Sequence, residues 1–122
     1  MKNIPEPDEW RQQASIFLWA DSMLYKHPEL WLLNGSLNGV RLSIGQAVKA
    51  KRCGEKRGYP DIFLPVSRKG FHGLYIELKK KRGGVVSKEQ AEWLDRLSTQ
   101  GFFAIVCRGY DSAVKAIENY LN

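Results

Sequence analysis

Three side chains in the middle of the chain combine two acids with one base at a spacing that suits phosphate chemistry. Asp61 stands at the start of one apolar run, and Glu77 and Lys79 stand two residues apart in the next. Alternate residues of a strand project from one face, about 6–7 Å apart, and a hairpin would bring Asp61 to the same region. Two carboxylates suit Mg²⁺, which lowers the pKa of a bound water, and a neighbouring lysine can help to orient that water.

The same residues have a structural interpretation that the motif alone leaves open. Alternating charges along a strand are common on a solvent-exposed face, and Glu77 and Lys79 could simply form an ion pair. Two features favour the functional interpretation. The basic run at 79–82 follows at once, and burial of two acids and a lysine is costly unless they are paired or bound to a metal.

Positive charge is concentrated in the middle of the chain. The 122 residues include 19 Lys and Arg and 13 Asp and Glu, a net charge of +6, which is typical of proteins that bind nucleic acid. Basic residues gather in 41–57 and in 79–82, whereas acids gather near the N-terminus and in the last third. We expect salt-sensitive contacts with DNA phosphates from these side chains: Arg41, Lys49, Lys51, Arg52, Lys80, Lys81 and Arg82.

The first part of the chain predicts one helix and a turn-rich segment. Residues 8–26 have helical spacing, with Asp8 as the N-cap. The predicted apolar face consists of Trp10, Ala14, Phe17 and Leu24. Residues 30–44 contain two Asn-Gly turn signals, Asn34-Gly35 and Asn38-Gly39. In this segment we expect short extended pieces at 31–33 and 41–44, and a short basic helix follows at 45–53.

The second part predicts strands that alternate with helices. The runs 62–66 and 73–79 predict a hairpin, with Tyr75, Glu77 and Lys79 on one face of its second strand. Ser87 and Gln90 form a capping box that begins a helix ending at Gly101. Residues 102–108 predict a strand buried on both faces, and Asp111 is expected to cap a last helix. This order predicts an α/β fold whose mixed sheet joins an antiparallel hairpin to a parallel crossover.

Pro60-Asp61 followed by Glu77-x-Lys79 resembles the PD-(D/E)xK nuclease motif. The segments 58–62, 72–79 and 87–94 closely resemble the VRR-NUC domain, and the likeness runs from about Glu9 to Leu121. It implies a single nuclease domain over 1–122 with a restriction-endonuclease-like α/β core. It also implies cleavage of DNA phosphodiesters that depends on Mg²⁺ or Mn²⁺.

The resemblance also implies roles for individual residues. Asp61 and Glu77 would be metal ligands, and Lys79 would be the catalytic lysine. Glu9 is the best match to a further acid that the family site takes from its first helix. Gln90 matches a glutamine close to the family's site, although its side chain could instead serve only the capping box.

Small stand-alone members that resemble this chain are often viral (phage) and cleave junctions as homodimers. The resemblance therefore implies a structure-selective endonuclease that resolves four-way (Holliday) junctions as a C₂ dimer, and we expect the first helix or 30–44 to form the dimer contact. The alternatives are cleavage of flaps, nicked or linear DNA, and a non-catalytic basic DNA-binding module. No apolar run is long enough to span a membrane, and we expect no signal peptide because the first ten residues contain no apolar segment. We therefore expect a cytoplasmic protein (host cytoplasm if viral) without a membrane partner.

Overall fold

The computed structural model describes residues 4–37 and 40–122, so the expected Asn38-Gly39 turn lies outside the described residues. Its helices are α1 (Glu9–Ser22), the 3₁₀ helix η1 (Pro28–Leu32), α2 (Ile44–Arg52), α3 (Lys88–Thr99) and α4 (Tyr110–Leu121). Its strands are β1 (Asn34–Gly35), β2 (Ile62–Leu64), β3 (Leu74–Lys79) and β4 (Phe103–Arg108). None of the helices in these ranges is long and apolar enough to cross a membrane.

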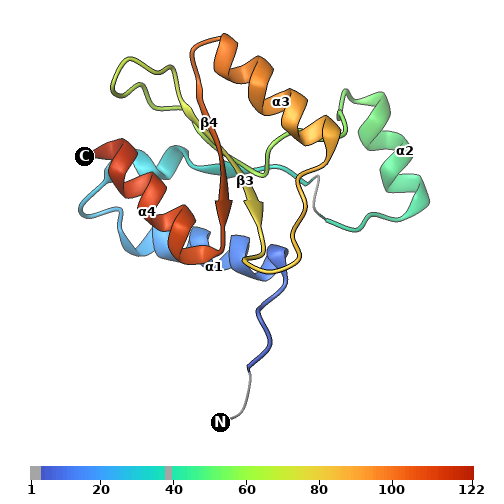
Figure 1. Ribbon diagram of the computed structural model, residues 1–122, viewed down its shortest axis with the longest axis horizontal. Helices are drawn as coiled ribbons and strands as arrows, with labels where there is room; N and C mark the ends of the chain where they lie inside the picture. Colours follow the sequence, from blue (N-terminus) through green and yellow to red (C-terminus); the bar gives the residue numbers. More distant parts are fainter. Residues whose placement is uncertain (1–3, 38–39) are drawn as a thin grey trace.

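The four strands form one mixed sheet in the order β1-β2-β3-β4 (Figure 1). β1 and β2 are antiparallel, and β2 and β3 form the predicted hairpin, in which Ile62 pairs with Ile76. β3 and β4 are parallel and are joined through α3, as the sequence predicts. The α/β fold class with a mixed sheet is therefore confirmed.

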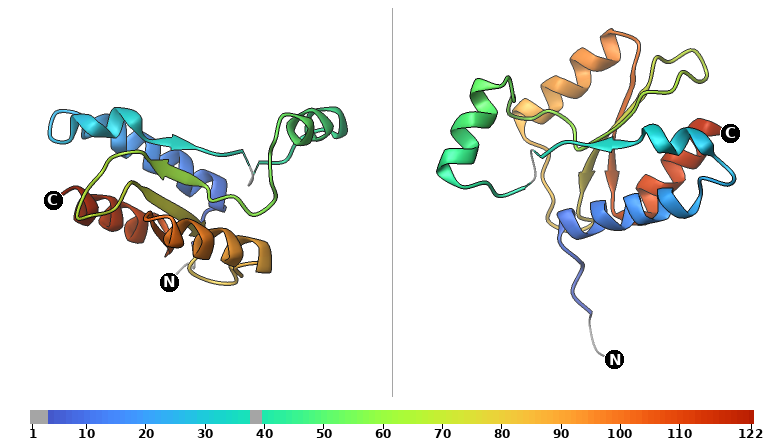
Figure 2. Two further views of the ribbon diagram at one scale, coloured as in Figure 1. Left: turned by 90° about the horizontal axis from the view of Figure 1, so that it is seen from above. Right: turned by 180° about the vertical axis from the view of Figure 1, so that it is seen from behind.

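The core lies where β2 and β3 meet the helices α1 and α4. α1 packs against α4 and β3, and α4 also packs against β4. The largest fully buried apolar side chains include Ile16, Ile62, Leu64, Leu74, Ile76, Leu78, Ile117 and Tyr120. α2 lies apart from the sheet at one side of the molecule (Figure 2), and each of its residues is exposed or only half-buried.

The first helix is shorter than predicted, and only part of the predicted apolar face, Phe17 and Leu24, packs against the core. It ends at Ser22, and Asp8 occupies the N-cap position without a side-chain cap to the described chain. Gln12, Ile16 and Ala20 are buried, whereas Trp10 of the predicted apolar face is 55% exposed. Hydropathy misleads here because the buried Gln12 amide is satisfied by hydrogen bonds on both of its ends.

Two of the predicted extended pieces are wrong. The first falls mostly in η1, which begins with Pro28, a residue suited to the first turn of a helix. The strand in this region is instead Asn34–Gly35, where the sequence predicts a turn. Residues 41–43 form no strand, and Ser43 caps α2 through a capping box with Gln46.

The strands β3 and β4 differ in burial, and β4 is less buried than the sequence predicts. Every residue of β3 is buried, so neither of its faces is solvent-exposed. β4 is an edge strand, and only Cys107 in it is buried, because no further strand covers its outer side within the described chain. α4 begins at Tyr110 with Gly109 at its N-cap position, so Asp111 lies inside the first turn and does not cap it.

Candidate active site

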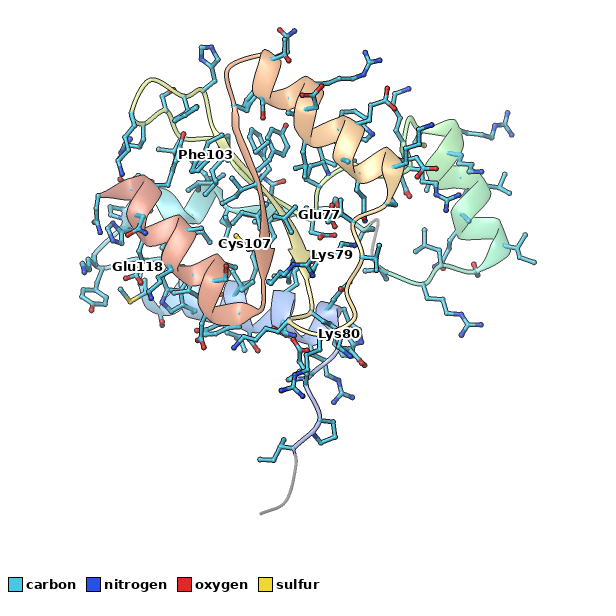
Figure 3. The ribbon with its side chains drawn as sticks, viewed as in Figure 1. Glu77, Lys79, Lys80, Phe103, Cys107 and Glu118 are labelled. Carbon is cyan, nitrogen blue, oxygen red and sulfur yellow. The ribbon has the colours of Figure 1, made fainter. Side chains whose placement is uncertain are left out.

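The hairpin brings the two predicted acids and the lysine together. Asp61 immediately precedes β2, and Glu77 and Lys79 lie on β3, where Ile62 pairs with Ile76. Antiparallel pairing thus sets Asp61 opposite Glu77. The exposed fractions are 8% for Asp61, 1% for Glu77 and 7% for Lys79, so this is a buried polar cluster. Figure 3 labels Glu77 and Lys79 on β3.

Hydrogen bonds fix the orientation of both carboxylates. Asp61 Oδ2 accepts the backbone N–H of Leu78 at 2.7 Å. Glu77 Oε2 lies 3.5 Å from Lys79 Nζ and accepts a hydrogen bond from Gln90 Nε2 at 3.1 Å. The second oxygen of Glu77, Oε1, is buried and has no hydrogen-bond partner among the described residues. It is therefore the one carboxylate oxygen of Glu77 that remains available to a ligand.

Gln90 combines its two predicted roles in one side chain. Its Oε1 accepts the backbone N–H of Ser87 at 2.9 Å, which completes the capping box of α3. Its Nε2 donates to Glu77. The cap thus orients the amide so that its donor end faces the carboxylates, and the start of α3 becomes part of the cluster.

The cluster is electrostatically strained when no cation is bound. Burial is the main cause that raises the pKa of Glu77 to about 9, and the neighbouring Asp61 contributes to this rise against the opposing effect of Lys79. Burial also raises the pKa of Asp61. Two buried carboxyl groups that share one lysine hold a proton at neutral pH. A divalent cation would replace that proton.

The two carboxylates and Lys79 line a cavity of about 540 Å³, whose wall also includes Glu9, Glu55, Gln90 and two further basic residues, Lys51 and Arg57. The sequence predicts a phosphate contact for Lys51 but not for Arg57. The sequence feature that could have identified Arg57 as a site residue is its position at the end of the basic segment 41–57, directly before Gly58. Gly58 has φ +92°, and a Cβ there would lie 2.7 Å from the backbone of Glu89. Glycine therefore lets this segment pass close to the start of α3.

The structure brings some of the other predicted residues to the cavity and leaves others outside it. Glu9 lies on the wall, but its Oε2 is engaged by the backbone N–H of Lys80 at 3.0 Å. Gln13, one turn further along α1, donates to the backbone oxygen of Asp61 at 3.3 Å. The remaining predicted phosphate contacts lie outside the cavity lining: Arg41, Lys49, Arg52, Lys80, Lys81 and Arg82.

The donor set fits a hard divalent cation. Carboxylate oxygens are the ligands that Mg²⁺ prefers, and one or two of them with water and substrate phosphate suffice. Asp61 and Glu77 supply two, and Glu77 Oε1 has no other partner in the described chain. No group of three or more His, Cys, Asp or Glu suited to a metal occurs within 4–37 and 40–122. Glu9 is therefore a neighbour of the pair, and the three acids do not form one cluster.

The model of the VRR-NUC domain matches residues 9–111. The chain belongs to the VRR-NUC domain family. A solved structure of a VRR_NUC domain protein is 28% identical to this chain, with a TM-score of 0.81, over 97% of this chain and 91% of that one. No curated protein matched the chain.

Membership of the VRR-NUC family indicates a nuclease-type domain. The matched range begins at Glu9 and includes Asp61, Glu77, Lys79 and Gln90. The buried cluster and its cavity thus lie inside the family domain.

Proposed function

We propose that this chain is a divalent-metal-dependent endonuclease that hydrolyses DNA phosphodiester bonds. The observation that carries the proposal is the buried Asp61–Glu77 pair, with one Glu77 oxygen free of partners in the described chain and Lys79 beside it. A pair that must share a proton in the absence of a cation is costly for a fold to keep. A metal-assisted reaction supplies a physical reason for the arrangement.

Each residue of the cluster has a distinct task in this mechanism. Asp61 and Glu77 would hold Mg²⁺ or Mn²⁺, which neutralises charge on the phosphate and supplies a water of lowered pKa. Gln90 keeps the Glu77 carboxylate oriented through its Nε2. Lys79 Nζ, 3.5 Å from Glu77 Oε2, stabilises the negative charge that develops on the phosphate. By the family resemblance, the products carry 5′-phosphate and 3′-hydroxyl ends.

Basic side chains on and near the cavity would hold the DNA backbone. Lys51 and Arg57 reach the cavity wall, so they contact phosphates next to the cleaved bond. Lys49 and Arg52 extend this charge along the exposed α2. Contacts of this kind recognise the backbone and its shape, not the base sequence.

We propose a four-way junction as the substrate and a homodimer as the active form. Paired cuts in a junction require two active sites related by a two-fold axis, and the described chain has one carboxylate cluster. Exposed apolar side chains on α1 and η1 support one of these segments as the dimer contact: Leu18 is 72% and Trp31 79% exposed.

A cleavage assay tests the proposal. Labelled four-way junction, flap and linear duplex DNA are incubated with the protein in Mg²⁺, Mn²⁺ or EDTA, beside an Asp61→Asn control. We expect metal-dependent paired cuts in the junction that the variant does not make. Cuts in flap or linear DNA alone would refute the junction and keep the nuclease. Binding without cleavage in either metal would favour the non-catalytic module.

Oligomeric state is tested separately, by size-exclusion chromatography with light scattering. We expect a mass of two chains at micromolar concentration. A mass of one chain at that concentration would contradict the dimer and leave the assignment of the carboxylates unchanged.

A further inference from the structure

The loop that follows β3 directs three consecutive backbone N–H groups at carboxylates from the N-terminal region. Lys80 N–H donates to Glu9 Oε2 at 3.0 Å. Lys81 N–H donates to Glu6 Oε2 at 2.6 Å, and Arg82 N–H donates to Glu6 Oε1 at 3.1 Å. Successive amides that converge in this way form an anion-binding concavity. In this chain the carboxylates of Glu9 and Glu6 occupy it, and Glu6 takes the last two amides.

Glu6 is held on this loop as an anion. Each of its two oxygens accepts one backbone N–H, and Gln12 Nε2 adds a third donor at 3.2 Å. The hydrogen bond from Lys81 is the main cause of the lowered pKa of Glu6, and the charge of Lys80 contributes. Residues 4–8 that carry Glu6 have no regular secondary structure, and the segment projects from the body (Figure 1).

The loop itself is built more firmly than the segment that covers it. It begins directly after Lys79 at the end of β3 and folds back, so that a Cβ on Gly84 would lie 3.1 Å from the backbone of Lys80. Arg108 of β4 donates to the backbone oxygen of Gly84 at 2.7 Å. We therefore expect the amides to keep their direction if Glu6 leaves.

The occupied concavity has the charge and the position of a phosphate site. Its amides belong to a run of three basic residues, 80–82, whose side chains are partly or fully exposed. Lys81 is two residues beyond Lys79, which is about 7 Å of extended chain. One strand of DNA carries a phosphate for about each 3.4 Å of axial rise, so a phosphate close to the cleaved bond falls at this distance.

We propose that Glu6 occupies a site for a DNA backbone phosphate, and that the N-terminal segment must leave the amides of Lys81 and Arg82 before the DNA binds there. The proposal rests on the proposed function in taking DNA as the ligand. A carboxylate and a phosphate both offer two oxygens to a pair of successive N–H groups. Glu6 therefore lowers the affinity for DNA by competing for these donors.

Two variants of equal charge test the competition. Glu6→Gln removes the anion from the amides, whereas Asp8→Asn removes an exposed carboxylate of the same segment that makes no cap on α1. DNA binding is measured in EDTA over a range of salt. We expect Glu6→Gln to bind at least about threefold more tightly than Asp8→Asn, with a salt slope steeper by about 0.9, the effect of one added phosphate contact. Equal affinities, or weaker binding by Glu6→Gln, would overturn the proposal.

A second measurement uses inorganic phosphate as the probe and does not depend on DNA. We expect phosphate to shift the ¹⁵N–¹H resonances of Lys81 and Arg82 in Glu6→Gln at concentrations that leave them unchanged in Asp8→Asn. Equal shifts in the two variants would refute the site even if both bind DNA. If no variant binds DNA, the proposed function fails, and the phosphate titration still decides whether Glu6 covers an anion site.

Discussion

The hairpin cluster and helix α2 both carry charged residues assigned to the same reaction, yet they are built in opposite ways. Asp61, Glu77 and Lys79 are each more than nine-tenths buried, and every residue of β3 around them is buried as well. α2 stands apart from the sheet (Figure 2), and its three basic residues, Lys49, Lys51 and Arg52, are all exposed.

This contrast separates two kinds of electrostatics. In the hairpin, burial raises the pKa values of both carboxyl groups. Because the groups are buried together, a change in the charge of one of them alters the interaction energies of its neighbours. On α2 the charges are solvated, and their effect on DNA depends on their number and on salt. Substitutions in the hairpin should therefore act steeply on chemistry, and substitutions on α2 gradually on affinity.

Glu77→Gln should have the largest effect. Glutamine has the size of glutamate, and its amide is neutral, as is the protonated Glu77 carboxyl at neutral pH. We therefore expect the melting temperature without metal to be unchanged. Loss of a metal ligand should lower the cleavage rate by about 10³-fold or more, since metal assistance contributes several kcal/mol and each 1.36 kcal/mol is tenfold. Single-turnover cleavage and DNA binding are measured together. Retained cleavage with normal folding would refute Glu77 as a ligand.

The sequence predicts the hairpin side of this comparison well. Alternation along 73–79 and the turn before 62 predict a hairpin that brings Asp61 to the region of Glu77, and the structure has this hairpin, with Ile62 paired to Ile76. The structure buries the charged face of β3, a point that period-two alternation leaves open because it does not distinguish a solvated polar face from a covered one. The capping box predicts the start of α3, but not that the amide of Gln90 also reaches Glu77.

The N-terminal region is predicted less well, for a different reason. Its hydrophobic pattern points to Trp10, whereas the helix buries Gln12. That choice depends on partners distant in sequence, since Gln12 Oε1 accepts the backbone N–H of Tyr110 at 2.8 Å. The contacts of Glu6 with the 80–82 loop are likewise invisible to local patterns. Hydrogen bonds between polar residues that are distant in the sequence are therefore the part of this fold that the local spacing of residues does not predict.

Gln90→Glu should have the next largest effect. Glutamate keeps an oxygen to accept the N–H of Ser87, so the capping box and the stability of α3 are retained. It replaces the donor to Glu77 with a negatively charged acceptor. We expect cleavage to fall by about 10–100-fold, the usual effect of losing a partner of a metal ligand, while the melting temperature changes little. Gln90→Met, which loses both roles, serves as the comparison and should also be less stable. Unchanged cleavage by Gln90→Glu would confine Gln90 to capping.

The double substitution Lys49→Ala with Arg52→Ala tests the α2 side of the comparison. Both residues are exposed, so the fold should keep its stability, and the DNA affinity should fall by about tenfold at moderate salt. The slope of log affinity against log salt should decrease by up to about 1.8, or 0.9 for each lost phosphate contact. Lys26→Ala with Lys115→Ala is the charge-matched control, because these exposed lysines lie outside α2. Equal losses in the two double variants would mean that only net charge matters.

The smallest effect should be a pH-dependent response of stability to metal. Folding raises the pKa of Glu77 from 4.5 to about 9, so between these values the folded chain binds a proton that the unfolded chain has released. The free energy of unfolding without metal should therefore decrease as the pH rises through this range.

A divalent cation binds the deprotonated carboxylates, so it competes with that proton. We expect Mn²⁺ to raise the melting temperature by a few degrees at pH 8.5, since about 1 kcal/mol shifts the melting of a domain this size by roughly 4 °C, and by less at pH 5.5. Glu77→Gln is the matched control and should lose most of this difference, because it leaves Asp61 as the only carboxylate of the pair. An equal metal response at both pH values, or one that survives in Glu77→Gln, would mean that the cation binds elsewhere and that the buried hairpin is not its site.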